Sequence, residues 1–540
     1  MASILPISGV LGKDRAAHLL RRTTFGITIQ QVNAYANKTA SQAMSSLLVA
    51  ASYTDKPLNV DGSGTSFLDS DFDSVNDGIY NNYGQIFWLN KFLKDKTAFS
   101  KIALFWNNHF AISSATGNRY IHAFRYYTTL NQHALGNFKD FIIAMTKDPL
   151  MLLWLNGHEN QKGANNIPSN ENYARELQEL FTIGATAPDG TANYTETDVR
   201  EAARVLTGWR TQNSSGNINT LSSQFFLSRH DIDDKQFSAK YQNTIIQGKN
   251  TTTAGDEELV ALIDMILAQP ECAKFICRKL YKWFVAAEIS TEIETDIITP
   301  LANTFRSNNY QILPVIAQLL SSEHFYSETI KGSIIKHPLD FILNIFRFGN
   351  LPTPDPATQT AQFYPVFEKG IRSVAQTLRM NILKHDTVFG WEAFYQTEMY
   401  KIWINSTSLR TRMAHSDLLV SGYSAKSFKV TFDVIPLTEA ILQDVGYTFA
   451  NKTSPTASDI LLADKIIEGF CYYLYPKSCT STQIQSLKDT LLLQGELNET
   501  GFWFEWKYYA DGDTAAQNGL KVKLNNMLKF MLKSPEFHLI

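Results

Sequence analysis

Long apolar runs are missing from this sequence of 540 residues. No segment reaches the roughly 18 consecutive apolar residues that a helix needs to span a bilayer. The first residues, Met1–Pro6, carry neither the positive charge nor the apolar stretch of a secretory signal. The sequence therefore predicts no transmembrane segment and no signal peptide in this chain.

Basic charge in excess is also absent. The 49 Lys and Arg residues are set against 52 Asp and Glu residues, a formal net charge of −3, and the basic residues form no dense run. Proteins whose main partner is nucleic acid usually present a basic patch. We therefore expect no nucleic-acid partner.

Cysteines are few, 4 in all. Cys272 and Cys277 lie in an apparent helix, on which their side chains point apart, so a disulfide between them is not expected. Cys471 and Cys479 flank Tyr475–Lys477, a segment that can turn the chain back. The sequence leaves the pairing of these two cysteines, and with it the compartment, open.

Familiar catalytic signatures are absent as well. The sequence contains no GxSxG, no Walker loop, no GxGxxG, no HExxH or CxxC pair and no EF-hand loop. Nucleotide binding therefore has no support, and a metal or catalytic site has to be assembled from segments that lie far apart in the chain.

The sequence does contain enough apolar residues for a large core, 44% hydrophobic and 12% aromatic. Their spacing predicts a mainly α fold, a multi-helix array around a central polar pocket, with minor β in the C-terminal part, where Phe428–Phe432 alternates like a strand. Three prolines in Leu351–Thr360 indicate a linker. We therefore divide the chain into an N-terminal helical domain, residues 1–345, and a C-terminal helical domain, residues 346–540.

The most informative segment is Asn170–Phe181. At helical spacing its apolar residues share one face and its polar residues the other. The polar face consists of Glu171, Asn172, Arg175, Glu176 and Glu179. Ser169 or Asn170 can cap the start of this helix, and Gly184 follows its end. The pattern predicts a helix, and leaves the role of its polar face open.

Two interpretations of that polar face compete. It is either a solvated stripe in which Arg175 pairs with Glu171 and Glu179, or a carboxylate cluster that binds a metal or transfers protons. Charge runs are usually solvated, so the segment alone favours the first interpretation. Polar residues in other segments raise the second.

Three of these segments stand out. His109 follows Trp106 and two asparagines. Glu196 and Asp198 open a further helix, in which Thr195 and Asp198 also match a helix-capping box. The dipeptide His230–Asp231 is followed by Lys235, a cation for an anionic ligand. A later aromatic-dense segment, Trp391–Trp403, fits either a groove for a sugar or peptide or the interior of the fold.

These segments, in this order, resemble the bacterial domain-of-unknown-function 1800 family. The matching residues are Arg22–Gly26, Trp106–Phe110, His133–Phe138, Asp148–Met151, Asn170–Gly184, Tyr194–Trp209, His230–Asp231 with Lys235, Gly390–Trp391 and Trp403–Arg412. The resemblance covers most of the chain but implies no agreed reaction. It implies an exported bacterial protein and a companion of sulfatase-like proteins that carry twin-arginine signals. We therefore expect the periplasm or the cell surface, reached through a partner, rather than the cytoplasm.

We expect the fold to gather these polar residues in one pocket. The predicted catalytic residues are Glu176, Glu179, His230 and Asp231. The predicted substrate-binding residues are Arg175, Lys235, Asn172 and Trp209. The predicted ligands of a divalent metal are His109, Glu176, Glu196 and Asp198.

Three classes of function stay open. The first is a metal-dependent hydrolase that acts on an anionic or glycan substrate. The second is a non-catalytic binding partner or chaperone-like companion of a sulfatase-like protein, and the third is a structural surface protein. The first is slightly favoured, because an ionic network kept only for architecture is often replaceable by apolar packing.

Overall fold

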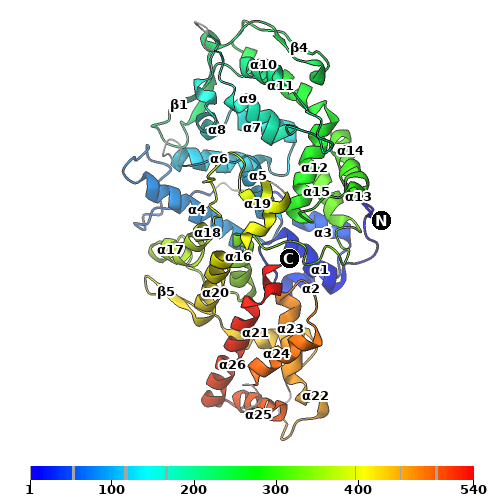
Figure 1. Ribbon diagram of the computed structural model, residues 1–540. Coiled ribbons are helices and arrows are strands. Elements are labelled where there is room, and N and C mark those ends of the chain that lie inside the picture. Colours follow the sequence, from blue (N-terminus) through cyan, green and yellow to red (C-terminus); the bar gives the residue numbers. More distant parts are fainter. Residues whose placement is uncertain are drawn as a thin grey trace. The chain divides into compact units, whose positions relative to one another are not determined.

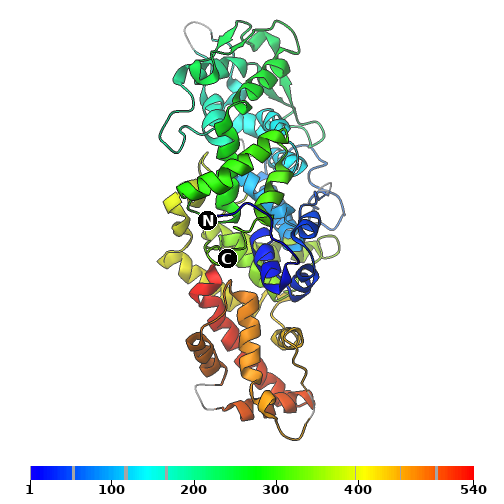
Figure 2. The same cartoon turned by 90° about the vertical axis from the view of Figure 1, so that its right-hand side faces the viewer.

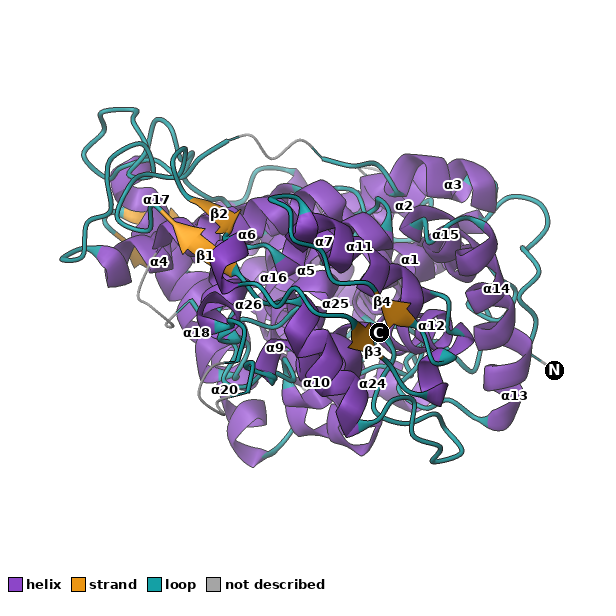
Figure 3. Ribbon diagram, turned by 90° about the horizontal axis from the view of Figure 1, so that it is seen from above, coloured by secondary structure: helices purple, strands orange, loops and turns teal. Residues whose placement is uncertain are grey.

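The computed structural model describes residues 2–51, 55–114, 120–163, 168–395, 397–449, 452–492 and 497–540. Helices account for 58% of the structure, and its strands form only two-stranded sheets (Figure 3). The prediction of a mainly α protein with minor β structure is confirmed.

The chain forms two compact units, each assembled from segments that lie apart in the sequence. Unit 1 comprises Met1–Ile7, Met44–Phe325 and Asn381–Tyr400, and unit 2 comprises Ser8–Ala43, Tyr326–Met380 and Lys401–Ile540. Helix α3 (Ala40–Leu47) and the 3-10 turn η7 (Thr397–Trp403) cross the division. The division of the chain into residues 1–345 and 346–540 stays a prediction.

Unit 1 contains the helices that carry most of the predicted site residues, and two small hairpins. Its α-helices are α4 (Asp77–Lys94), α5 (Phe99–His109), α6 (Tyr120–His133), α7 (Phe138–Thr146), α8 (Pro149–Trp154), α9 (Asn172–Glu176), α10 (Glu196–Val205), α11 (Ala254–Leu267), α12 (Pro270–Phe284), α13 (Thr291–Ile293), α14 (Thr299–Ser307), α15 (Ile312–Ser321) and α19 (Glu392–Tyr395). Its shorter turns are η1 (Gly157–Glu159), η2 (Leu177–Thr182), η3 (Leu227–Arg229), η4 (Ala239–Tyr241) and η5 (Glu294–Ile298). Helices α12, α14 and α15, green in Figures 1 and 2, pack against one another.

Helix α5 is a buried helix of unit 1. All residues from Phe99 to Asn107 are buried, including the polar Ser100, Lys101 and Asn107. His109 is the last residue of this helix and is therefore held inside the unit rather than at its surface.

Both hairpins of unit 1 lie in a segment for which no strand was predicted. Strand β1 (Trp209–Gln212) pairs antiparallel with β2 (Ser222–Phe225), and β3 (Lys235–Gln236) pairs antiparallel with β4 (Ile245–Ile246). These strands have two to four residues, too few to show an alternating pattern.

Unit 2 is built around a second buried helix, α16 (Pro338–Phe348), every residue of which is buried. Its other helices are α1 (Gly12–Thr23), α2 (Ile29–Ala36), α17 (Thr360–Phe367), α18 (Ser373–Thr377), α20 (Ser406–Ser421), α21 (Val434–Asp444), α22 (Ala457–Ile460), α23 (Leu462–Leu474), α24 (Ser481–Leu491), α25 (Glu499–Ala510) and α26 (Thr514–Lys533), with the turns η6 (Glu368–Arg372) and η9 (Pro535–His538). The strand predicted at Phe428–Phe432 is confirmed as β6 (Phe428–Val430), which pairs with β5 (Tyr423–Ala425).

The cysteines divide as the sequence allowed. Cys471 and Cys479 form a disulfide that ties the end of α23 to the segment before α24. Cys272 and Cys277 are free and buried, so the absence of a disulfide between them is confirmed. Across the described ranges, no helix combines the length and the apolar character that a bilayer crossing requires, in agreement with the prediction of no transmembrane segment.

Candidate functional site

The predicted helix at Asn170–Phe181 is present, but it changes type midway. Helix α9 passes directly into η2, a π-helical turn, which ends before Gly184 in the left-handed conformation (φ 80°). The apolar face is buried as predicted, and the polar side chains lie toward solvent or are half-buried. A π-turn often marks a functional position, because its wider bonding pattern leaves carbonyl groups available to other partners.

Two side chains from other helices bind those carbonyl groups. The Nε2 atom of His109 lies 3.0 Å from the carbonyl oxygen of Phe181, and the Nζ atom of Lys279 on α12 donates to the carbonyl oxygen of Leu180 over 3.0 Å. Lys279 Nζ also lies 3.2 Å from His109 Nδ1. Because an ammonium only donates, Nδ1 accepts and Nε2 carries the proton that is donated to Phe181. The π-turn is thus hydrogen-bonded to side chains of α5 and α12.

His109 is a neutral, enclosed imidazole. Burial, followed by the positive charge of Lys279, holds its pKa well below the usual value. Aromatic rings surround it, Trp106 and Phe110 among them with centroids 5.3 and 4.5 Å away. Both ring nitrogens are engaged, so binding a metal through His109 requires one of these two hydrogen bonds to break.

Lys279 escaped the sequence analysis. Burial, with a smaller contribution from Lys282, lowers its pKa to about 7. The helical period of the segment already accounts for the position of Lys279 on α12. The sequence therefore did not indicate that Lys279 contacts His109.

Arg175 is committed to an ion pair at the surface. Its guanidinium binds both carboxylate oxygens of Glu196, over 2.8 and 2.7 Å, and reaches Glu171 over 3.3 Å. Asn172 is exposed and donates to the side chain of Asn156 over 3.1 Å. This part of the polar face resembles the solvated stripe, and its Arg175–Glu171 pair has the predicted i,i+4 spacing.

Glu176 and Glu179, the carboxylate pair, behave differently. Both are half-buried, and burial together with the negative charge of Glu179 raises the pKa of Glu176 to about 7, although Arg175 opposes the shift. Tyr194 donates its hydroxyl hydrogen to Glu179 over 3.3 Å. Burial is the main cause of a raised pKa for Tyr395 on α19, and the negative charges of Glu179 and Glu176 raise this pKa further. The Tyr395 side chain therefore lies close enough to the carboxylate pair to interact with its charge.

Helix α19 is positioned next to this region by contacts within unit 1. The backbone N–H of Trp391 donates to the side chain of Asn108 over 2.7 Å, and the Phe394 ring lies 4.6 Å from that of Trp283 on α12. Tyr395 itself is 41% exposed, and its ring centroid is 4.2 Å from that of Phe389, which is 38% exposed. Two open aromatic rings therefore accompany the carboxylate pair.

Asp198 is a structural cap. One of its oxygens accepts from the backbone and the hydroxyl of Thr195, each over 2.8 Å, which confirms the predicted capping box. The same carboxylate accepts from the hydroxyl and the backbone of Ser238, each over 2.7 Å. Both oxygens of Asp198 therefore accept hydrogen bonds from these neighbours.

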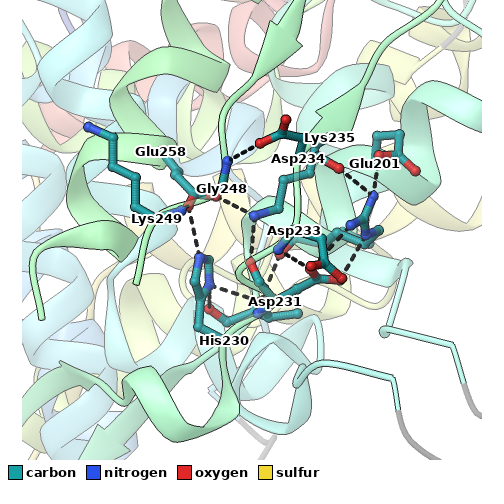
Figure 4. A network of polar contacts seen from close by, with 12 residues as sticks. Glu201, His230, Asp231, Asp233, Asp234, Lys235, Gly248, Lys249 and Glu258 are labelled. Atoms are coloured by element: carbon teal, nitrogen blue, oxygen red, sulfur yellow. Dashed lines mark hydrogen bonds and ion pairs between the residues drawn. The ribbon is translucent and has the colours of Figure 1, made fainter. Parts of the chain in front are cut away.

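His230, Asp231 and Lys235 form a separate, buried network with residues that the sequence analysis missed (Figure 4). Glu258 on α11 lies at its centre, 2.6 Å from Lys235 Nζ and 3.1 Å from His230 Nε2. Burial alone would raise the pKa of Glu258, but the hydrogen bonds from His230 and Lys235 lower it. Lys235, Glu258 and His230 have no exposed side-chain surface, so these three side chains are closed to a substrate.

Asp231 faces the outer part of the same network. Its carboxylate accepts from Arg204 on α10 over 2.8 and 3.2 Å, and Arg204 also binds Glu201 over 2.6 Å. Trp209 lies in β1, is buried, and packs on Phe225 with Lys147 Nζ 5.1 Å from its ring. These contacts place the predicted residues in several local networks rather than in one set of converging side chains.

The described part of the chain contains no group of three or more His, Cys, Asp and Glu side chains arranged to hold a metal ion. Of the four predicted ligands, His109, Glu196 and Asp198 are engaged as described above, and Glu176 lies in the carboxylate pair. The pair is the one place among the predicted residues where two carboxylates meet at a half-open surface.

The fold and these polar segments define a mainly α-helical protein with a carboxylate pair at the junction of α9 and the π-turn. The chain belongs to the family described as protein of unknown function (DUF1800), which matches residues 18–539 and so nearly the whole chain. No curated protein and no solved structure matches the chain.

Proposed function

We propose that this protein is a hydrolase in which Glu176 is the general acid and Glu179 the partner carboxylate. The observation that carries the proposal is the raised pKa of Glu176, about 7, in a half-buried carboxylate pair. A carboxyl group that stays protonated near neutral pH can give its proton to a leaving group, while a charged neighbour acts as base or nucleophile.

The surroundings of the pair favour a glycan over an anionic substrate. The exposed rings of Tyr395 and Phe389 supply flat apolar surface, and the Tyr194 hydroxyl supplies a polar contact. The two cations assigned to an anionic substrate, Arg175 and Lys235, are neutralised by Glu196 and Glu258. A substrate with hydroxyl groups and little charge therefore fits this surface best.

A divalent cation is the competing occupant of the carboxylate pair. Two carboxylates that repel each other are stabilised by a bound cation as well as by a shared proton. The two cases differ in one observable. A bound cation lowers the pKa of Glu176. If the activity depends on a bound cation, adding Mg²⁺, Ca²⁺ or Zn²⁺ should therefore extend that activity to higher pH.

The test is hydrolysis of a panel of nitrophenyl glycosides and bacterial polysaccharides by the whole protein, with each cation and with chelator. We expect turnover that falls above about pH 7, where Glu176 loses its proton. Glu176→Gln should lower it by roughly 100-fold or more. Glu171→Gln is the matched control, since Glu171 lies on the same helix face and pairs with Arg175. No hydrolysis of any member, or equal loss in both variants, would overturn the proposal.

Export and a protein partner complete the proposal. The disulfide between Cys471 and Cys479 supports an oxidising compartment, the periplasm or the cell surface. A sulfatase-like carrier with its own signal is the proposed route, and the non-catalytic companion role is the alternative to the hydrolase. Deleting the carrier's signal tests the route by cell fractionation, because an unchanged location would contradict it.

A further inference from the structure

The guanidinium group of a buried arginine in unit 2 pairs with no carboxylate of the described residues. Arg412 on α20 has no exposed surface. Its Nη2 atom donates to the carbonyl oxygen of Lys336 over 2.8 Å, and its guanidinium carbon lies 5.0 Å from the Phe341 ring centre. Among the described residues, no hydrogen-bond partner faces its Nε or Nη1 atoms. A buried charge with unsatisfied donors is costly unless an anion or other acceptors compensate for it.

The nearest side chains on the same helix add donors instead of negative charge. Ser416 lies four residues after Arg412, on the same face of α20, and is fully buried. Its hydroxyl oxygen also has no hydrogen-bond partner in the described ranges. His415 lies beside it, with its ring 6.4 Å from that of Phe341.

His538, after α26, approaches the same Phe341 ring from the C-terminal end of the chain. Its ring centroid is 5.6 Å from that of Phe341, and neither of its nitrogens meets a partner among the residues described. Burial, then the positive charges of Arg412 and Lys336, lowers the pKa of His538 to about 3. The electrostatic potential here is therefore positive.

Asp340 does not neutralise this charge by direct contact. Its negative charge acts on Arg412, yet burial dominates and lowers the pKa of that guanidinium to about 9. The carboxylate of Asp340 lies 3.1 Å from His337 Nε2, and the single hydrogen bond seen for Arg412 leads to a carbonyl group. Arg412 therefore has no direct contact with a carboxylate among the described residues.

We propose that Arg412, Ser416 and His538 form a binding site for a small inorganic oxyanion, sulfate or phosphate, inside unit 2. The oxygen atoms of such an ion accept from the guanidinium Nε–H and Nη1–H, the hydroxyl and an imidazole N–H. Its charge balances Arg412, for which guanidinium–oxyanion pairing is the preferred geometry. Ordered water would satisfy the hydrogen bonds but leave the charge uncompensated.

The experiment compares the whole protein in sulfate, phosphate and chloride at equal ionic strength and fixed pH. Thermal unfolding and titration calorimetry measure binding of each ion. We expect sulfate or phosphate to bind near one per chain and raise the melting temperature above that in chloride. Arg412→Met should abolish both effects.

Arg21→Met is the matched control. Arg21 is a buried arginine of the same unit that donates to the carbonyl oxygen of Tyr472, and burial lowers its pKa to about 10. This variant should lose stability yet keep the response to sulfate. Equal stabilisation by chloride and sulfate, or an unchanged response in Arg412→Met, would overturn the proposal. If Arg412→Met does not fold, Ser416→Ala replaces it, and at least a fivefold weaker affinity is expected.

Discussion

Lys235 and Glu258 form an ion pair 2.6 Å long in which neither side chain has any contact with solvent. The same carboxylate lies 3.1 Å from His230 and accepts from the backbone of Lys249 over 2.8 Å. The pair therefore joins strand β3 to α11. Because the surrounding hydrogen bonds depend on both charges, removing either partner should destabilise the fold.

We expect Lys235→Met to cost about 3 to 5 kcal/mol of unfolding free energy, because Glu258 is left charged and buried. The double variant Lys235→Met with Glu258→Leu should recover a large part of that loss. Urea unfolding followed by tryptophan fluorescence measures both. Lys249→Ala, which removes an exposed pair with Glu257, should change little. A Lys235→Met protein as stable as the wild type would refute the structural role of the network.

The disulfide allows a simple chemical prediction. When the protein is unfolded without reductant, two of its 4 cysteines, Cys272 and Cys277, should react with iodoacetamide, and all of them after reduction. Intact-mass analysis counts the alkyl groups.

Cys471→Ser with Cys479→Ser should lower the stability of unit 2 by about 2 to 3 kcal/mol, the loop-closure contribution expected for a short loop. Cys272→Ala tests the alternative that any cysteine change has this effect. It keeps the disulfide, so reductant should lower its stability as it does that of the wild type, whereas the double variant should not respond to reductant. Four reactive thiols in the unreduced protein would argue against both the disulfide and the proposed oxidising compartment.

Sequence patterns predicted the fold class and the buried face of one helix, because both depend on the spacing of apolar residues. The apolar residues of Asn170–Phe181 have a helical period, so the buried face followed directly. The π-turn in the same segment did not, because a shift from four-residue to five-residue bonding over six residues leaves no mark in hydrophobic spacing.

The sequence did not predict the partners of the site residues, and the reason is a different one. Glu258 lies near the start of α11 and Lys279 near the middle of α12, positions at which a charged residue is usually solvated. Only the packing of these helices on distant segments buries them. Tyr395 was recognised in an aromatic segment, but nothing in that segment pointed to Glu176 or Glu179.

The contact between His109 and the π-turn can be tested by mutation. His109→Leu replaces the imidazole by an apolar side chain of similar size and leaves the Phe181 carbonyl and Lys279 without their imidazole partner. We expect a loss of about 2 to 3 kcal/mol, since buried polar groups become unsatisfied.

The effect should also be local. Hydrogen exchange of residues 177–184 should become faster in His109→Leu, with little change in unit 2. His133→Leu is the control, because His133 is half-exposed and stacks on Phe141. Unaltered exchange of the π-turn in His109→Leu would mean that the turn does not depend on this contact.

The last prediction concerns the pH dependence of stability, and it requires no substrate. The pKa of Glu176 is raised from 4.5 to about 7 in the folded chain. Between these values the folded state holds a proton that the unfolded state has lost, so stability falls as pH rises. The favourable contribution is complete below about pH 4.5 and is lost as the pH passes 7.

Glu176→Gln removes this titration. Relative to wild type it should gain stability between pH 5 and pH 8, by about 1 kcal/mol, since water screens part of the shift at a half-exposed group. Melting temperatures of both proteins across this range measure the difference, and Glu171→Gln should follow the wild-type curve. A constant difference between Glu176→Gln and wild type from pH 5 to pH 8 would show that Glu176 is already ionised at pH 5, and would remove the physical basis for its role as a general acid.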